Sequence, residues 1–196
     1  KKWDYRCGEN SLAATLAIEW GQKLFSLINK SIETNDQVEK VKYFAANAIA
    51  GELIDPMFAT IKELQIKYGT WQMPWGEINR FQRISSDIDN KFDDNKPSIP
   101  VGFAASTWGM LPSYSSLTFP GTKKRYGVHG NSFICAVEFG KKVKAKSLLA
   151  GGESGNTNST HFFDQGLMYS KGQFKDVLFY KEDVMKHAGK KYHPGE

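Results

Sequence analysis

The chain has 196 residues, of which 40% are hydrophobic and 24% charged, and its formal net charge is +5. These values exclude a disordered chain and provide enough apolar material for one domain or a compact piece of a larger one. No window approaches ~20 uninterrupted apolar residues, so we expect no membrane span. Residue 1 is Lys rather than Met, and no apolar signal core follows it, so we expect a cut end.

Charge and cysteine content disfavour two further classes of protein, nucleic-acid-binding proteins and metalloproteins. The densest basic groups, such as residues 123–125 and 141–142, lie in turn-like stretches, which disfavours nucleic-acid binding. Cys7 and Cys135 have no second cysteine at metal-ligand spacing, so we expect no metal and no cofactor. Whether these two cysteines form a disulfide depends on the compartment, and both alternatives stay open.

Three helices are predicted between residues 10 and 68. Asn10 or Ser11 caps the first, in which apolar residues recur every three or four positions. Thr34 followed by Gln37 fits a capping box for the second helix. Local capping signals therefore predict where these two helices begin.

The third helix is predicted from a proline and two glycines. Gly51 is expected to weaken or end the second helix. Asp55 followed by Pro56 is typical of a helix N-terminus, and the apolar pattern then continues to Gly69.

The middle of the chain is irregular. Residues 69–76 hold two tryptophans, one proline and two glycines, which favours an ordered loop in which Trp71 and Trp75 pack. Residues 85–97 are polar and acidic, which predicts an exposed excursion. Residues 98–127 contain three prolines and four glycines and show no helical period.

The last third has strand signals. Residues 132–139 and 143–150 are β-prone and predict an antiparallel hairpin with one face partly wet. A short helix is predicted within 160–171, a strand at 177–180 and a polar turn or helix at 181–187. We therefore predict the α+β class for the chain.

The domain prediction follows from this change of pattern along the chain. Residues 1–196 are expected to form a single region, mainly helical over 1–97 and rich in loops and strands over 98–196.

One polar cluster follows a glycine-rich turn and is the main candidate site. His161 and Asp164 are three residues apart, so on a helix they would share a face and the carboxylate could orient the imidazole. The cluster either ties a buried turn to the sheet or lines a substrate site. Its members are Asn156, Ser159, His161, Asp164 and Gln165.

Three other segments are better explained by structure than by chemistry. Residues 151–156 lack the lysine of a phosphate-binding loop and the spacing of a nucleophile elbow, so a tight turn is expected. Glu77 and Arg80 have the spacing of a local ion pair. Cys7 has no surroundings typical of a nucleophile.

Several segments resemble the C-terminal part of the penicillin acylase family, which includes aculeacin and acyl-homoserine-lactone acylases. Trp3-Asp4 before a helix is similar to the family's Trp-Asp segment, and residues 68–83 to its Trp-Gly region. Residues 120–133 resemble the approach to its late strands. Residues 151–165 are similar to the family pattern Gly-Gly-Gln-Ser-Gly-Asn/Asp-Pro-x-Ser-Pro-His-Tyr/Phe-x-Asp-Gln. The departures are Glu153 for Gln, and Thr157 and Thr160 for Pro.

The resemblance implies an N-terminal-nucleophile amidohydrolase with a four-layer αββα fold. In such enzymes an N-terminal serine attacks an amide carbonyl, and its α-amino group serves as base. Since residue 1 is a lysine, the resemblance implies that this serine lies upstream and that the present piece carries no catalytic residue. Alone, this piece is expected to hydrolyse nothing and to leave apolar strand edges exposed.

The resemblance also implies partners and a compartment. The expected partners are the upstream part of the large subunit, the small subunit of the same precursor and a small N-acylated substrate. The acyl amide itself stays open, whether β-lactam, homoserine lactone, lipopeptide or another amide. A bacterial periplasmic or secreted location is expected. The alternative is a non-catalytic binding module derived from the acylase C-terminal region.

Overall fold

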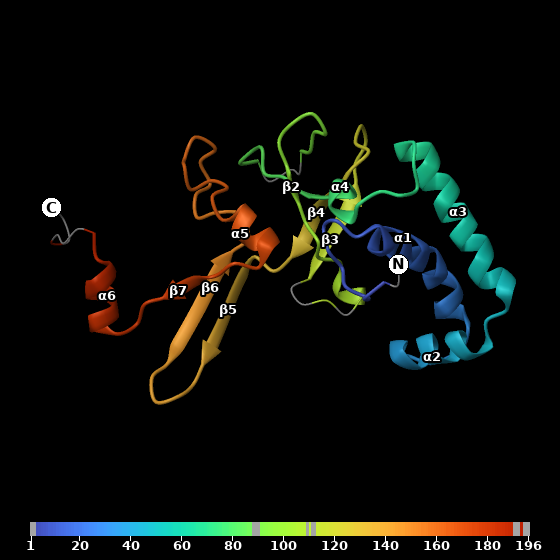
Figure 1. The fold of residues 1–196 in the computed structure, drawn as a ribbon, viewed down its shortest axis with the longest axis horizontal. Coiled ribbons are helices and arrows are strands. Elements are labelled where there is room, and N and C mark those ends of the chain that lie inside the picture. Colours follow the sequence, from blue (N-terminus) through green and yellow to red (C-terminus); the bar gives the residue numbers. More distant parts are fainter. Residues whose placement is uncertain (1–2, 88–90, 109, 111–112, 190–192, 194–196) are drawn as a thin grey trace. The chain divides into compact units, whose positions relative to one another are not determined.

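The structure is a computed structural model. It describes the chain except residues 1–2, 88–90, 109, 111–112, 190–192 and 194–196, so the expected cut end at Lys1 lies outside the described residues. Two compact units make up the chain, Lys1–Gln82 with Asn90–Gly130 and Arg83–Asp89 with Asn131–Glu196. Helices dominate the first half and strands come later, which confirms the predicted α+β class (Figure 1). One continuous region over 1–196 stays a prediction.

The first two helices begin at capping side chains. Helix α1 spans Leu12–Lys30, and the Ser11 hydroxyl accepts a hydrogen bond from the Ala14 amide at 3.1 Å, as predicted. Helix α2 spans Gln37–Asn47, but its cap is Asp36 rather than Thr34. The Asp36 carboxylate lies next to the helix and accepts two of its free amides, so the Thr34 capping box was wrong.

Helix α3 spans Ala50–Tyr68 and begins before the predicted Asp55–Pro56 boundary. The Glu52 carboxylate accepts a hydrogen bond from the Ile49 amide at 3.0 Å and so caps the helix at this earlier start. The Trp20 indole of α1 donates to the Leu53 carbonyl at 3.0 Å and holds the additional turn in place. Tertiary anchoring therefore places Pro56 inside the helix, despite the usual cost of proline there.

Because α3 begins earlier than predicted, the prediction that Gly51 weakens or ends the second helix was wrong. Gly51 lies in the first turn of α3 and does not end α2. The C-terminus of α3 is at Gly69, which has the left-handed φ of 78°, as predicted.

A four-stranded sheet completes the first unit. Its order is β2-β1-β4-β3, with β1 and β4 parallel and the other pairs antiparallel. The strands within 98–127 were not predicted from the sequence. In β3, for example, the buried positions are Tyr114 and Ser116 while Leu117 is exposed, so the strand shows no apolar alternation. The elements are α4 (Trp75–Ile78), β1 (Asn79–Phe81), β2 (Ile99–Pro100), the 3-10 turn η1 (Ser106–Trp108), β3 (Tyr114–Thr118) and β4 (Arg125–Gly130).

The core of the first unit joins α1, α3 and α4. Trp75 is buried there, but Trp71 remains 36% exposed. The predicted packing of both tryptophans is therefore right only for Trp75. The buried core cluster consists of Ala14, Ile18, Leu64, Trp75, Ile78 and Ala104.

Part of the acidic excursion predicted over 85–97 is tied down. The Phe92 ring stacks on Tyr126 with ring centroids 4.8 Å apart. The fully buried Tyr126 donates its hydroxyl proton to Asp94 at 2.8 Å, and the Lys123 amide donates to the same carboxylate at 2.6 Å. These contacts fix residues 92–94 against the β3–β4 hairpin, so the prediction of a simple exposed excursion was wrong here.

The second unit holds the predicted hairpin. Strands β5 (Phe133–Glu138) and β6 (Lys144–Leu149) pair antiparallel, and β7 (Lys175–Val177) pairs with the other edge of β6 (Figure 1). Helix α5 covers only Gly166–Lys171, because the segment before it forms turns. Helix α6 spans Lys181–His187, as predicted.

The strand predicted at 177–180 lies at 175–177 instead, where β6 offers a partner. Among the helices of the described chain, none has the length and apolar character needed to cross a membrane.

Removing the Tyr126 hydroxyl tests the anchor at Asp94. Burial acts to raise the pKa of Asp94, but the hydrogen bonds from Lys123 and Tyr126 outweigh it and hold the pKa below its usual value. A carboxyl group with a lowered folded-state pKa stabilises the fold above its ordinary pKa, and this stabilisation is lost as the pH falls through the lowered value. We expect Tyr126→Phe to reduce the free energy of unfolding by about 1–2 kcal/mol at pH 7.

Urea unfolding of both proteins between pH 7 and pH 3 checks this expectation. The difference should shrink toward acid pH as Asp94 becomes protonated. A difference that does not change with pH would contradict the anchor.

Candidate functional site

The glycine-rich turn after β6 brings backbone segments very close together. Gly151 has a φ of 108°, which favours glycine. A Cβ atom on Gly152 would lie 2.3 Å from the His161 carbonyl oxygen and 2.8 Å from that of Phe162. The geometry is therefore the expected tight turn, closed on the segment that precedes α5.

Gln165, the residue before α5, packs against this turn and is only 3% exposed. Its Oε1 accepts from the Leu149 amide at 3.1 Å, and its backbone amide donates to the Gly151 carbonyl at 2.8 Å. Its Nε2 donates to Glu153 at 3.0 Å. One side chain thus connects the end of β6, the glycine-rich turn and the start of α5.

His161 and Asp164 do come together, but not on a helix. Nδ1 of His161 lies 2.8 Å from Oδ2 of Asp164 within the turns that precede α5. The hydrogen bond from the imidazole is the main cause that holds the pKa of Asp164 below its usual value. With 67% of its side chain exposed, the imidazole is accessible to solvent.

Ser159 and Asn156 shape the turn locally. The Ser159 hydroxyl accepts from the His161 backbone amide at 3.1 Å, while the imidazole pairs with Asp164 instead. The Asn156 side chain accepts from the Asn158 amide at 2.9 Å. Of the five predicted residues, only Gln165 ties the turn to β6. The other four make contacts within the turns themselves, and a role in lining a substrate pocket stays a prediction.

Two further residues that contact these turns, Arg83 and Lys175, were not predicted from the sequence. The Arg83 guanidinium donates to the Phe162 carbonyl and lies 4.1 Å from the centroid of the Phe162 ring. Lys175 of β7 donates to Glu153 at 2.8 Å. Arg83 lies at the end of the Trp-Gly region, and Glu153, the partner of Lys175, departs from the family pattern, so the sequence does single out one residue of each pair. No local spacing, however, links Arg83 to Phe162 or Glu153 to Lys175.

The side chains of the other candidate segments make structural contacts or lack the surroundings of a reactive group. Arg80 donates to the Gly76 carbonyl at 2.9 Å and to both the carbonyl and the hydroxyl of Ser98, and Glu77 lies 4.0 Å away. Burial raises the pKa of the Cys7 thiol, which opposes formation of a reactive thiolate. Cys7 and Cys135 are both free thiols.

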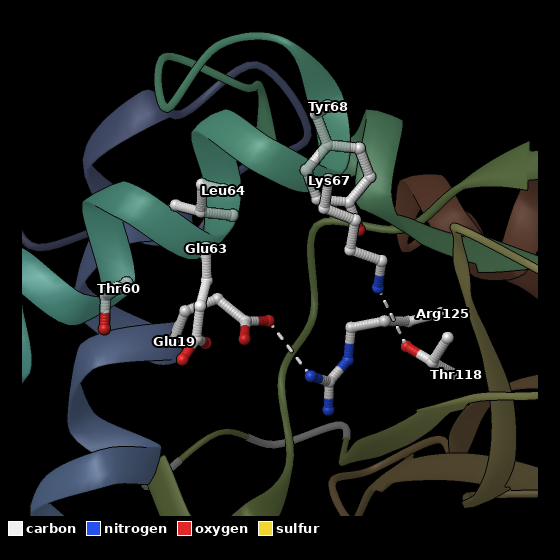
Figure 2. Close-up of a pocket in the computed structure, with 8 residues that line it drawn as sticks. All are labelled: Glu19, Thr60, Glu63, Leu64, Lys67, Tyr68, Thr118 and Arg125. Atoms are coloured by element: carbon white, nitrogen blue, oxygen red, sulfur yellow. Dashed lines mark hydrogen bonds and ion pairs between the residues drawn. The ribbon is translucent and has the colours of Figure 1, made fainter.

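The first unit has a separate polar pocket of about 130 Å³ between α1, α3 and the β3–β4 hairpin (Figure 2). Arg125 donates to Glu19 at 3.0 Å, and Lys67 donates to the Thr118 hydroxyl at 3.2 Å. Its eight lining residues include neither a histidine nor a serine. They are Glu19, Thr60, Glu63, Leu64, Lys67, Tyr68, Thr118 and Arg125.

The charges of this pocket already have protein partners. Arg125 also donates to the Ser116 carbonyl at 2.8 Å, and Glu63 pairs with Lys23 at 2.7 Å. Burial lowers the pKa of Lys67. These polar side chains therefore connect α1 and α3 to the β3–β4 hairpin, and this structural role explains the pocket best.

One comparison with known proteins identifies a family. The model of penicillin amidase matches residues 1–186. The matched range includes the Trp-Asp segment, the Trp-Gly region and the glycine-rich turn, so the resemblance stated from these segments is confirmed.

Two glycines of the same turn provide a matched test of its packing. We expect Gly152→Ala to lower the free energy of unfolding by about 1–3 kcal/mol, because the methyl group would overlap backbone oxygens. Gly155→Ala is the control, since a Cβ there meets nothing within 4 Å. Denaturant unfolding of the three proteins gives the answer, and equal losses in the two variants would contradict the close approach.

The Glu153–Lys175 pair predicts a second observable. The hydrogen bond from Lys175, with a smaller contribution from Gln165, holds the pKa of Glu153 below its usual value. We expect Lys175→Met to raise the Glu153 pKa in an NMR titration of the side-chain carboxyl groups. Lys142→Met is the control, because Lys142 pairs with Glu182 instead. An unchanged Glu153 titration in Lys175→Met would show that the pair does not form in solution.

Proposed function

The chain belongs to the penicillin amidase family, and on this premise we propose that it is the C-terminal piece of the large subunit of an acylase. The enzyme would cleave the amide of N-acylated small molecules. Its nucleophile would be an N-terminal serine upstream of these residues, whose α-amino group takes the proton. The family match over residues 1–186 carries this proposal.

In this proposal the present residues support the site and do not perform the chemistry. The specific polar motif of the chain is used to close a turn: Gln165 bonds the sheet, and Ser159 bonds the backbone rather than the imidazole. A network of this kind holds loops in a fixed position, which is what a pocket wall near a reacting amide requires.

The proposed partners follow from the family. Its members are processed into subunits, so we propose the upstream part of the large subunit and the small subunit of the same precursor as partners. The substrate would be a small N-acylated molecule. We further propose a bacterial periplasmic or secreted location.

An activity comparison tests the proposal. The 196-residue chain and the natural protein purified from its source are assayed with phenylacetyl and long-chain N-acyl amides. We expect turnover only by the natural protein, and we expect a serine-directed acylating reagent to abolish it. Serine-dependent turnover by the 196-residue chain would contradict the proposal.

Intact mass and N-terminal sequencing of the natural protein provide the control. We expect a chain of greater mass that begins with serine and ends with the sequence of residues 193–196. A natural polypeptide that starts near Lys1 without a companion would exclude this route to catalysis and would favour the binding module.

A further inference from the structure

One edge of the second unit's sheet is open. Strand β5 pairs with β6, and within the described part of the chain no strand pairs with its other edge. Its six residues, Phe133–Glu138, make it twice as long as β7, the strand at the opposite edge. Open edges of this kind offer a row of amides and carbonyls to another strand.

The hydrogen bonds reveal which residues face that edge. The Ala150 amide donates to the Ser132 carbonyl at 2.9 Å, so this pair is a bonded one in the β5–β6 ladder. Bonded and non-bonded pairs alternate in an antiparallel ladder, and Phe133, Cys135 and Val137 therefore direct their amides and carbonyls away from β6. The Leu149 amide, opposite Phe133, agrees with this assignment because it donates to Gln165 instead.

The same three residues share an uncovered apolar face. Alternate residues of a strand point to one side, and Phe133 is 57% and Val137 43% exposed, with Cys135 also exposed. Across the sheet, Val177 continues this apolar strip and is exposed too.

The opposite face of the sheet is partly buried and partly charged. Leu148 is buried there, where α5 contacts β6. Toward the hairpin end, Lys144 pairs with Glu138 at 3.9 Å, and Lys146 pairs with Asp176 at 3.8 Å. The face of Phe133, Cys135 and Val137 is thus exposed and apolar along β5. Farther from the open edge, this face also carries Lys175, which pairs with Glu153.

We propose that a strand from the companion polypeptide of the same precursor adds to the open edge of β5. Its backbone would bond to Phe133, Cys135 and Val137, and its alternate apolar side chains would extend the strip on their face. This inference rests on the proposed function, in which the chain is one piece of a processed acylase. It adds the place and the mode of assembly.

The form and size of the edge argue for this occupant. An alternating row of free amides and carbonyls matches a strand, whereas a helix has no backbone groups to offer it. A second copy could pair antiparallel around Cys135, with Phe133 opposite Val137. However, three partly exposed side chains provide far less than the roughly 800 Å² per partner of a standard stable interface. A strand held by further contacts within one enzyme does not need that area.

Hydrogen exchange measured by NMR tests the proposal at single residues. In the isolated 196-residue chain we expect slow exchange at Ile134 and Ala136 and fast exchange at Phe133, Cys135 and Val137. In the intact processed enzyme we expect all five amides to be protected. Maleimide labelling of Cys135 in a Cys7→Ser background should likewise occur in the isolated chain and be lost in the intact enzyme.

A matched pair of variants separates backbone pairing from side-chain packing. Val137→Pro removes an outward amide, which an edge strand tolerates, whereas Val137→Thr keeps both the amide and the β-branched shape. We expect both isolated chains to keep the Ile134 and Ala136 protection. In the intact enzyme, only Val137→Pro should reopen the edge to exchange.

Three results would overturn the inference. The edge amides could be protected in the isolated chain at every concentration, which means that the chain covers its own edge. Their protection could rise with the concentration of the isolated chain, which identifies a second copy as the occupant. They could also remain open in an intact enzyme that is active, in which case this inference fails while the proposed function stands. An inactive natural protein without a companion would instead overturn the proposed function.

Discussion

The first unit depends on the close approach of two backbones at Gly76. Its amide donates to the Glu9 carbonyl at 2.7 Å, and a Cβ there would lie within 2.9 Å of atoms of both Glu9 and Pro100. The neighbouring Trp75 amide donates to the Ser11 carbonyl at 3.2 Å. The short helix α4, part of the Trp-Gly region, thereby joins the segment that leads into α1 to the sheet.

The second unit uses the same device at Gly152. A missing side chain again allows two backbones to approach. The two carbonyls that face Gly152 have other donors, since the Ser154 amide donates to His161 and the Arg83 guanidinium donates to Phe162. Glu153, which stands where the family pattern has glutamine, accepts from Gln165 and pairs with Lys175. Its carboxylate therefore links the turn to the start of α5 and to β7.

The successful predictions depend on neighbours along the chain, although the local choice of Thr34 over Asp36 failed. Contacts between distant residues were missed. Ser11 caps α1 by a bond three residues away, which a local pattern can reveal. The start of α3 depends on Trp20, a residue of another helix, and the local Asp55–Pro56 signal pointed elsewhere. The site divides in the same way, since the His161–Asp164 spacing was visible, whereas the contact of Arg83 with Phe162 spans 79 positions.

The family match covers the glycine-rich turn, and the contacts of this turn are structural. Gln165 and the glycine-rich turn are held by the end of β6, and β6 is the central strand between β5 and β7. A strand added at β5 would therefore stiffen the same sheet whose central strand carries the turn. Assembly with the companion polypeptide would then also fix the position of the glycine-rich turn, because both depend on the same three-stranded sheet.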